Sequence, residues 1–431
     1  MTGDPQALTV LEGKARAGDV GAQFEFAVTL DRAGRRGEAT SWLEKAGEGG
    51  HPSALTLMAI ADLQGLERPR DVERAVQRLR RAASSGGTEA QRILAILTAV
   101  GTFGDADWTG AIEFLMAAAK DDDPQALRQL GLLIEMASPG SVLAEDLLLR
   151  AGLKGDGLAA FAVLRRQASG RVLAAEEYCA QWRVGIARFN HPLAQLVAAA
   201  TPAAPGQIDP KLPEGAVDWA AVRALLAVPP GVAMRDGAQV SAQPFIRRFE
   251  SLLSAEECEY VLGMSARHLR PAEIVDQSSG RPKESRVRTN SVSVLWPVHQ
   301  DLVVHALNLR LSAAAGLAPE NGEMINVLMY RPGEEYRPHY DFFPIEAARS
   351  DSSGQRIRTL LVYLNEDYAG GETHFSTAGH KIKGRVGDGL LFHNCDANGA
   401  PDKSSLHAGL PVVSGQKWLL SKWYREKRFV T

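Results

Sequence analysis

The chain has 431 residues, 45% of them hydrophobic, and a formal net charge of −3. This length allows two or three domains, each with its own core, and the apolar content excludes wholesale disorder. The small net charge gives no reason to expect nucleic acid or an anionic membrane surface as a partner.

The cysteines and the apolar segments indicate the compartment. Cys179, Cys258 and Cys395 form no C-x-x-C pair, which argues against a disulfide scaffold or a cysteine zinc site and fits a reducing environment. The chain does not open with a basic stretch followed by an apolar run, and its apolar runs are interrupted before they reach membrane-spanning length. A soluble cytoplasmic protein is therefore expected.

An alanine recurs every 32 to 36 residues in the first half, each time near a predicted helix start, at Ala22, Ala54, Ala90, Ala126, Ala159 and Ala194. A second amphipathic segment, such as "AVQRLRRAASSG", lies between successive alanines. A period in the mid-thirties with two helices per unit is typical of a stacked α-solenoid. Residues 18–200 resemble the Sel-type branch of the tetratricopeptide-like family, which implies a surface for a peptide or protein partner. A scaffold or dimerisation arm is an equally good interpretation.

Proline and glycine interrupt this pattern in residues 201–240, which we predict to be a linker with one short helix in "AVDWAAVRALLA". From residue 241 to 431 we expect a separate domain. Two helical segments, at 254–269 and 301–316, are followed by short β-type runs such as "MINVLMY", "RIRTLLVYL" and "QKWLLSKWY". Many short strands after flanking helices predict an antiparallel sandwich or small barrel.

The segment "YRPHYDFFP" places His339 and Asp341 two residues apart. On a strand these side chains would point to the same face and supply two members of a 2-His-1-carboxylate iron site. The pattern H-x-D alone is weak evidence, because "HQD" at 299–301 repeats it at a predicted helix start. His407 offers a third ligand. Lys417 follows within a hydrophobic strand, where a buried ammonium needs an anionic partner. That partner would be a bound ligand; the alternative is that Lys417 lies at a strand edge and its ammonium group reaches water.

Residues 241–431 resemble the catalytic domain of prolyl 4-hydroxylases, which are Fe(II)- and 2-oxoglutarate-dependent dioxygenases. The resemblance rests on "FESLLSAEECEYV", "RVRTN", "NVLMYRPGEEYRPHYDFF", "RTLLVYLNEDYAGGETHF", "GDGLLFHN" and "SLHAGLPVVSGQKWLLSKWYR", in this order. It implies a double-stranded β-helix, also called a jelly roll. The expected protein is multidomain α plus β, with an N-terminal α-solenoid of helix-pair repeats (1–200), a linker (201–240) and a C-terminal double-stranded β-helix with flanking helices (241–431).

The resemblance also implies roles for particular residues and four cofactors or co-substrates: Fe(II), 2-oxoglutarate, O2 and ascorbate. His339, Asp341 and His407 would bind iron, and Lys417 would pair with the distal carboxylate of 2-oxoglutarate. The hydroxyls of Tyr330 and Thr359 would bind the same carboxylate, and Trp423 would form a pocket wall. For Tyr330 or Thr359 taken alone, an ordinary strand residue is the alternative.

The substrate side is less defined. Polar loops at 276–290 and 345–356 are candidate lids, and Arg286 or Arg288 would then contact a peptide. Asn290 stands where the family usually has serine. The leading hypothesis is 4-hydroxylation of a peptidyl proline, with the repeats binding the protein substrate or a partner. The alternatives are a dioxygenase for a free amino acid or another side chain, and a solenoid adaptor with an oxygen-sensing domain.

Overall fold

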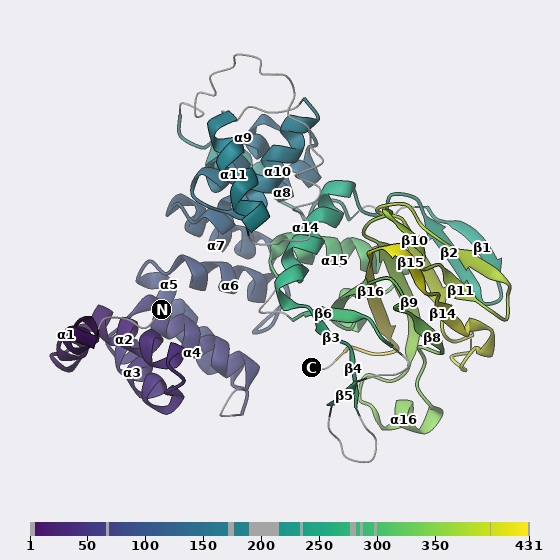
Figure 1. Cartoon of the computed structure of the whole chain (residues 1–431), viewed down its shortest axis with the longest axis horizontal. Helices are drawn as coiled ribbons and strands as arrows, with labels where there is room; N and C mark the ends of the chain where they lie inside the picture. The colour runs from purple at the N-terminus through teal and green to yellow at the C-terminus, as the bar shows by residue number, and fades with distance from the viewer. Residues whose placement is uncertain are drawn as a thin grey trace. The chain divides into compact units, whose positions relative to one another are not determined.

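Antiparallel helix pairs build the N-terminal part of the chain, as the alanine period predicts. The computed structural model describes residues 5–65, 69–170, 176–188, 215–232, 236–275, 282–284, 288–296, 300–396 and 398–429. After α1 (Pro5–Arg16), the pairs seen in Figure 1 are α2 (Val20–Arg32) with α3 (Arg36–Glu48), α4 (Pro52–Gln64) with α5 (Val72–Ser84), α6 (Thr88–Ala99) with α7 (Trp108–Lys120), α8 (Pro124–Ala137) with α9 (Val142–Leu153), and α10 (Gly157–Ala168) with α11 (Glu176–Arg188).

The repeat alanines explain why these helices pack closely. Ala54, Ala90, Ala126 and Ala159 are completely buried, and Ala22 is almost so. A methyl group fills little space, so the neighbouring helix can approach without leaving a void. The sixth alanine of the pattern, Ala194, lies outside the described residues.

Aspartate side chains cap several of these helices. The carboxylates of Asp19, Asp71, Asp107 and Asp123 each accept a hydrogen bond from a backbone N–H three residues later. These contacts satisfy donors that the first turn of a helix leaves without an intrahelical acceptor. The short helix predicted in the linker is present as α13 (Trp219–Leu225), capped by Asp218.

The described residues fall into two compact units. The first lies within residues 1–156, 212–230 and 300–305, and the second within residues 157–211, 231–299 and 306–431. The second unit contains all of the β-structure.

Two antiparallel sheets form most of the β-structure, in agreement with the jelly-roll prediction (Figure 1). The larger sheet has the strand order β1 (Ala238–Ala242), β2 (Phe245–Phe249), β13 (Gly389–His393), β9 (Arg356–Tyr363), β16 (Lys417–Arg425), β7 (Ile325–Tyr330), β6 (Ser291–Leu295), β3 (Arg270–Pro271). The smaller sheet has the order β12 (His380–Ile382), β11 (Thr373–Phe375), β14 (His407–Gly409), β8 (Tyr336–His339). Two short pairs complete the fold, β10 (Tyr368–Gly370) with β15 (Val412–Gly415) and β4 (Glu273–Val275) with β5 (Pro282–Glu284).

One hydrophobic core joins the two sheets. Phe375 of the smaller sheet packs edge-on against Phe392 of the larger sheet, with ring centroids 5.1 Å apart. Both rings are completely buried, together with Ile246 of β2. Side chains on alternate positions of a strand share one face, so the inward positions form this core. The polar residues discussed below lie on the same inner faces and are therefore shielded from water.

The two helices predicted in the second domain are present as α14 (Ala255–Ser265) and α15 (Leu302–Ala315). Ser254 caps α14, and Glu257 completes a capping box by accepting the Ser254 N–H. The segment 345–356, predicted to be a loop, instead contains the helix α16 (Ile345–Ser350). The polar, serine-rich composition of this segment predicts a loop, so the short helix could not be recognised from the sequence. Of the other predicted lid, 276–290, only β5 and residues 288–290 are described.

No helix among the described residues is both long and apolar enough to cross a bilayer. All three cysteines are buried, and none forms a disulfide.

Lys422 of β16 is 3% exposed and donates to the backbone carbonyl of Glu323 at 2.8 Å. Burial lowers the pKa of Lys422 to about 7, against the opposing charge of Glu323. The folded protein therefore holds fewer protons than the unfolded chain between about pH 7 and the ordinary lysine pKa. Folding stability should rise with pH across that interval, by up to about 1.4 kcal/mol per pH unit.

Lys422→Met is expected to remove this pH-dependent gain. The measurement is the free energy of unfolding by urea at pH 7, 8 and 9, compared with the wild type and with Lys381→Met, a change at an exposed lysine of β12. Parallel pH curves for wild type and Lys422→Met would contradict the prediction.

Candidate active site

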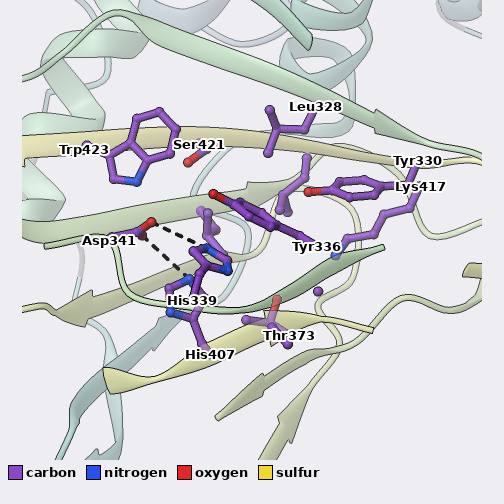
Figure 2. A pocket seen from close by; sticks show the side chains of 14 residues that line it. Leu328, Tyr330, Tyr336, His339, Asp341, Thr373, His407, Lys417, Ser421 and Trp423 are labelled. Atoms are coloured by element: carbon purple, nitrogen blue, oxygen red, sulfur yellow. Dashed lines mark ion pairs between the residues drawn. The ribbon is translucent and has the colours of Figure 1, made fainter. Parts of the chain in front are cut away.

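Three side chains of metal-ligating type converge at the open end of the core (Figure 2). His339 ends β8, Asp341 follows two residues later, and His407 begins β14 directly opposite His339 in the antiparallel pair. Their candidate ligand atoms all lie within 4.8 Å of one another. The Nε2 atom of His339 is 3.6 Å from Oδ1 of Asp341, and Nε2 of His407 is 3.7 Å from Oδ2. One correction applies, because Asp341 lies just beyond the strand and not on it.

Backbone carbonyls set the tautomer of both histidines. Nδ1 of His339 is 2.8 Å from the carbonyl oxygen of Arg337, and Nδ1 of His407 is 3.0 Å from that of Ser405. A carbonyl can only accept, so each Nδ1 carries the proton and each Nε2 keeps a lone pair. Both free nitrogens face Asp341. Two imidazoles and one carboxylate form the donor set that suits non-haem Fe(II) and leaves coordination positions open.

The charges at Asp341 and His407 also suit a cation. Burial alone raises the pKa of Asp341, but His407 and His339 outweigh it and hold the pKa well below the usual range. Burial lowers the pKa of His407 to about 4, although Asp341 opposes the shift. At neutral pH the carboxylate is thus ionised and His407 is neutral. These are the protonation states that a metal requires of its ligands.

Lys417 lies across the same pocket from the three ligands (Figure 2). It begins β16 opposite Tyr330 of β7, is 2% exposed, and donates to the carbonyl of Gly371 at 2.7 Å. Burial lowers the pKa of Lys417 to about 8, against the opposing charge of Glu372. Among the described residues no carboxylate lies within ion-pair distance of its Nζ atom. A buried cation without an anion is costly, so this end of the pocket is suited to a carboxylate ligand.

Comparisons with known proteins agree with this geometry. Residues 325–425 match the family model of the 2OG-Fe(II) oxygenase superfamily. Prolyl 4-hydroxylase 1 of Arabidopsis thaliana is 36% identical over 202 residues, which cover 44% of this chain and 71% of the relative. The chain belongs to the prolyl 4-hydroxylase family. It is a 2-oxoglutarate-dependent dioxygenase, as the sequence predicts.

Two kinds of solved structure are similar to this chain. One is viral collagen prolyl hydroxylase from Paramecium Bursaria Chlorella virus-1, in its 2OG complex, which is 28% identical with a TM-score of 0.32; the match covers 42% of this chain and 95% of the viral chain. The other is a Sel1 repeat protein from Oxalobacter formigenes, which is 24% identical with a TM-score of 0.36; the match covers 41% of this chain and 76% of the Sel1 repeat protein.

Of the other predicted site residues, Tyr330 and Trp423 line the pocket of the oxygenase, at its two ends. The Tyr330 ring centroid is 5.4 Å from Nζ of Lys417, and burial raises the pKa of its hydroxyl, which stays protonated as a hydrogen-bond donor. Trp423 lies at the Asp341 end, where its ring packs 4.2 Å from the guanidinium of Arg356.

Thr359 requires a correction. The resemblance assigned its hydroxyl to the 2-oxoglutarate carboxylate, but the structure places it against Asp341, with Oγ1 2.7 Å from Oδ2. The strand register explains the difference. Thr359 lies opposite Trp423, whereas Lys417 is six positions away along β16, which corresponds to roughly 20 Å.

Thr373 lines the pocket that contains Lys417, whereas Thr359 is not among the lining residues. Thr373 belongs to β11, is 3% exposed, and its Oγ1 lies 3.0 Å from the hydroxyl of Tyr363. Sequence analysis missed Thr373, although the alternation in "ETHF" contains the signal. Thr373 and Phe375 share the inward face of a short strand, and His374 points away from it.

Tyr336 was also missed. Its ring stacks on His339 with centroids 3.5 Å apart and planes 12° apart, and it limits the orientation of that ligand. The guanidinium of Arg288 lies 5.2 Å from the Tyr336 centroid, and its Nε donates to Asn290 at 3.0 Å. Arg288 therefore lies beside a residue that lines the pocket, and its contact with a substrate stays a prediction. Arg286 lies outside the described residues.

Proposed function

We propose that this dioxygenase hydroxylates a prolyl residue of a peptide or protein, at C4, with consumption of 2-oxoglutarate and O2. The observation that carries the proposal is a single pocket with three metal-ligating side chains at one end and the buried ammonium of Lys417 at the other. A 2-oxo diacid fits both ends, because its oxo acid group can bind a metal and its distal carboxylate can neutralise the lysine. The names of the relatives support proline as the target.

The chain would supply binding and orientation. His339, Asp341 and His407 would hold Fe(II), which supplies activation of O2 coupled to decarboxylation of 2-oxoglutarate to succinate and CO2. Lys417 would orient the co-substrate through its distal carboxylate, and the hydroxyls of Tyr330 and Thr373 would donate to the same group. Tyr336 and Trp423 would exclude water from the reacting end. Ascorbate would keep the iron reduced between turnovers.

The substrate would enter beside Tyr336 and Arg288. Asn290 is 1% exposed and accepts from Arg288, so it holds the guanidinium in place where the family usually has a serine. This difference is the one observation that favours the alternative of a free amino acid or another side chain as substrate. The helical repeats would bind the protein substrate or a partner. We keep 1–200, 201–240 and 241–431 as the functional divisions and propose the cytoplasm as the compartment, consistent with the absence of disulfides.

Proline-containing peptides are expected to stimulate succinate release by the purified protein supplied with Fe(II), 2-oxoglutarate, ascorbate and O2. The matched control is the same peptide set with every proline replaced by alanine. Mass spectrometry should find one added oxygen atom on proline. Stimulation by free amino acids and not by peptides would contradict a peptidyl substrate and favour the alternative, a free amino acid. No turnover with any substrate, and none without substrate, would favour the oxygen-sensing adaptor.

A further inference from the structure

A buried hydrogen-bond chain ends on the carboxylate of the candidate metal site. The Nδ2 amide of Asn394 is 2.9 Å from Oγ1 of Thr359, and Oγ1 is 2.7 Å from Oδ2 of Asp341. Asn394 and Thr359 are both 0% exposed, and Asp341 is 5% exposed. Water is therefore excluded from these contacts.

The direction of the chain follows from the chemistry of its two ends. An ionised carboxylate can only accept, so the single hydroxyl proton of Thr359 is donated to Asp341. The Thr359 oxygen must then accept from Asn394, and only the amide nitrogen of asparagine can donate. This orientation leaves the amide oxygen of Asn394 buried without a hydrogen-bond partner among the described residues. A buried carbonyl oxygen without a hydrogen-bond partner lowers the stability of the fold. An asparagine at this position therefore needs a compensating benefit.

The backbone of Asn394 is anchored on both sides. Its N–H donates to the carbonyl of Ile357 on β9 at 2.9 Å, and its carbonyl accepts from the N–H of Asp402 at 2.9 Å. Asp402 begins the turn that leads to His407, and Ser405 of that turn accepts from Nδ1 of His407. Asn394 is thus tied to two of the three candidate ligands, to Asp341 through Thr359 and to His407 through this turn.

We propose that Thr359 and Asn394 are positioning residues for a metal ligand. The Thr359 hydroxyl occupies Oδ2 of Asp341 and leaves Oδ1 as the oxygen that binds the metal. Thr359 acts on the carboxylate directly, and Asn394 acts through Thr359. The carboxylate is then held in its binding orientation before the cation arrives, so metal affinity depends on a hydroxyl that does not touch the metal. The inference rests on the metal site of the proposed function, but not on proline as its substrate.

The test is the Kd of Mn(II) for the metal-free full-length protein, measured by calorimetry, with thermal unfolding recorded in parallel. Thr359→Val keeps the shape and removes the proton, and it should raise the Kd about 10- to 100-fold. Thr359→Ser keeps the hydroxyl and should stay within about threefold of wild type. Ser312→Ala is the matched control, because Ser312 is another buried hydroxyl of this unit, 3.3 Å from the hydroxyl of Tyr424. It should lower stability at most and leave the Kd unchanged.

Asn394→Ala gives an independent check. It should raise the Kd less than Thr359→Val does, and it should have no further effect in the Thr359→Val background, because its action passes through that hydroxyl. A wild-type Kd in Thr359→Val would overturn the proposal. Additive effects of the two changes would overturn the role of Asn394. Failure to find a hydroxylated proline would leave these binding results untouched, so the two proposals fail separately.

Discussion

Replacement of Asp341 by alanine is expected to abolish iron-dependent succinate release. Asp341 is the only carboxylate of the described cluster, and both free histidine nitrogens face it at 3.6 and 3.7 Å. Its loss removes a ligand and the single negative charge that offsets a divalent cation. Loss of a residue that only supports a metal ligand lowers metal affinity by up to about 100-fold. Loss of the ligand Asp341 itself should lower Mn(II) affinity by more than that. Calorimetric titration of the metal-free variant measures the loss directly.

His374→Ala is the matched control for this experiment. His374 lies on β11 opposite Ala408, the residue that follows His407, but it belongs to the outward face of that strand. This variant should keep both metal binding and turnover. The fold of Asp341→Ala should survive, because the change removes a buried charge from the protein. Full turnover by Asp341→Ala, or equal losses in the two variants, would rule out the assigned ligand set.

Lys417→Ala is expected to weaken 2-oxoglutarate binding by roughly 2–5 kcal/mol, or about 30-fold to several thousand-fold in Kd. The bound carboxylate would be left in a buried site without its counter-charge. The measurement is the Kd of 2-oxoglutarate in the presence of Mn(II) and without O2, so that no turnover intervenes. Lys381→Ala, at an exposed lysine, should bind as the wild type does. An unchanged Kd in Lys417→Ala would remove this residue from the site.

The same assignment predicts a pH dependence. With its pKa lowered to about 8 by burial, Lys417 loses its proton above that pH in the ligand-free protein. Only the protonated form can pair with the carboxylate, so the Kd should rise about tenfold per pH unit above pH 8 and stay flat below it. Lys417→Ala should lack this rise. A wild-type Kd that is constant from pH 7 to 9.5 would contradict the assignment.

The helix pairs, the main strands and the clustering of His339, Asp341 and His407 were predictable from the sequence. Ala54, Ala90 and Ala126 recur at a fixed period because each stacked repeat needs a small side chain at the same buried place. His339, Asp341, His407 and Lys417 stood out because polar groups in apolar strands are rare unless they have partners. These signals are local, or repeat at a fixed interval, so a single chain displays them.

Neighbours across the sheets were harder to predict. Thr359 was assigned to the wrong partner and Thr373 was overlooked, although both are threonines in predicted strands. Which of them lines the pocket of Lys417 depends on the register of β9 against β16 and on which strand of the smaller sheet faces that pocket. Thr359 would have to shift by six residues along β16 to lie opposite Lys417, and no local feature of either segment specifies the register.

The sequence alone therefore determined the two kinds of architecture, the chemistry of the site and the identity of its charged residues. Each of these depends on residue type and on spacing along the chain. Only the tertiary structure decided that Asn394 and Thr359 form a hydrogen-bond chain to Asp341, that Tyr336 stacks on His339, and that Thr373 lines the pocket of Lys417. The contact of Asn394 with Thr359 joins residues 35 apart in sequence, and the contact of Lys417 with Gly371 joins residues 46 apart. Long-range strand pairing brings such residues together, and packing of the whole domain sets that pairing.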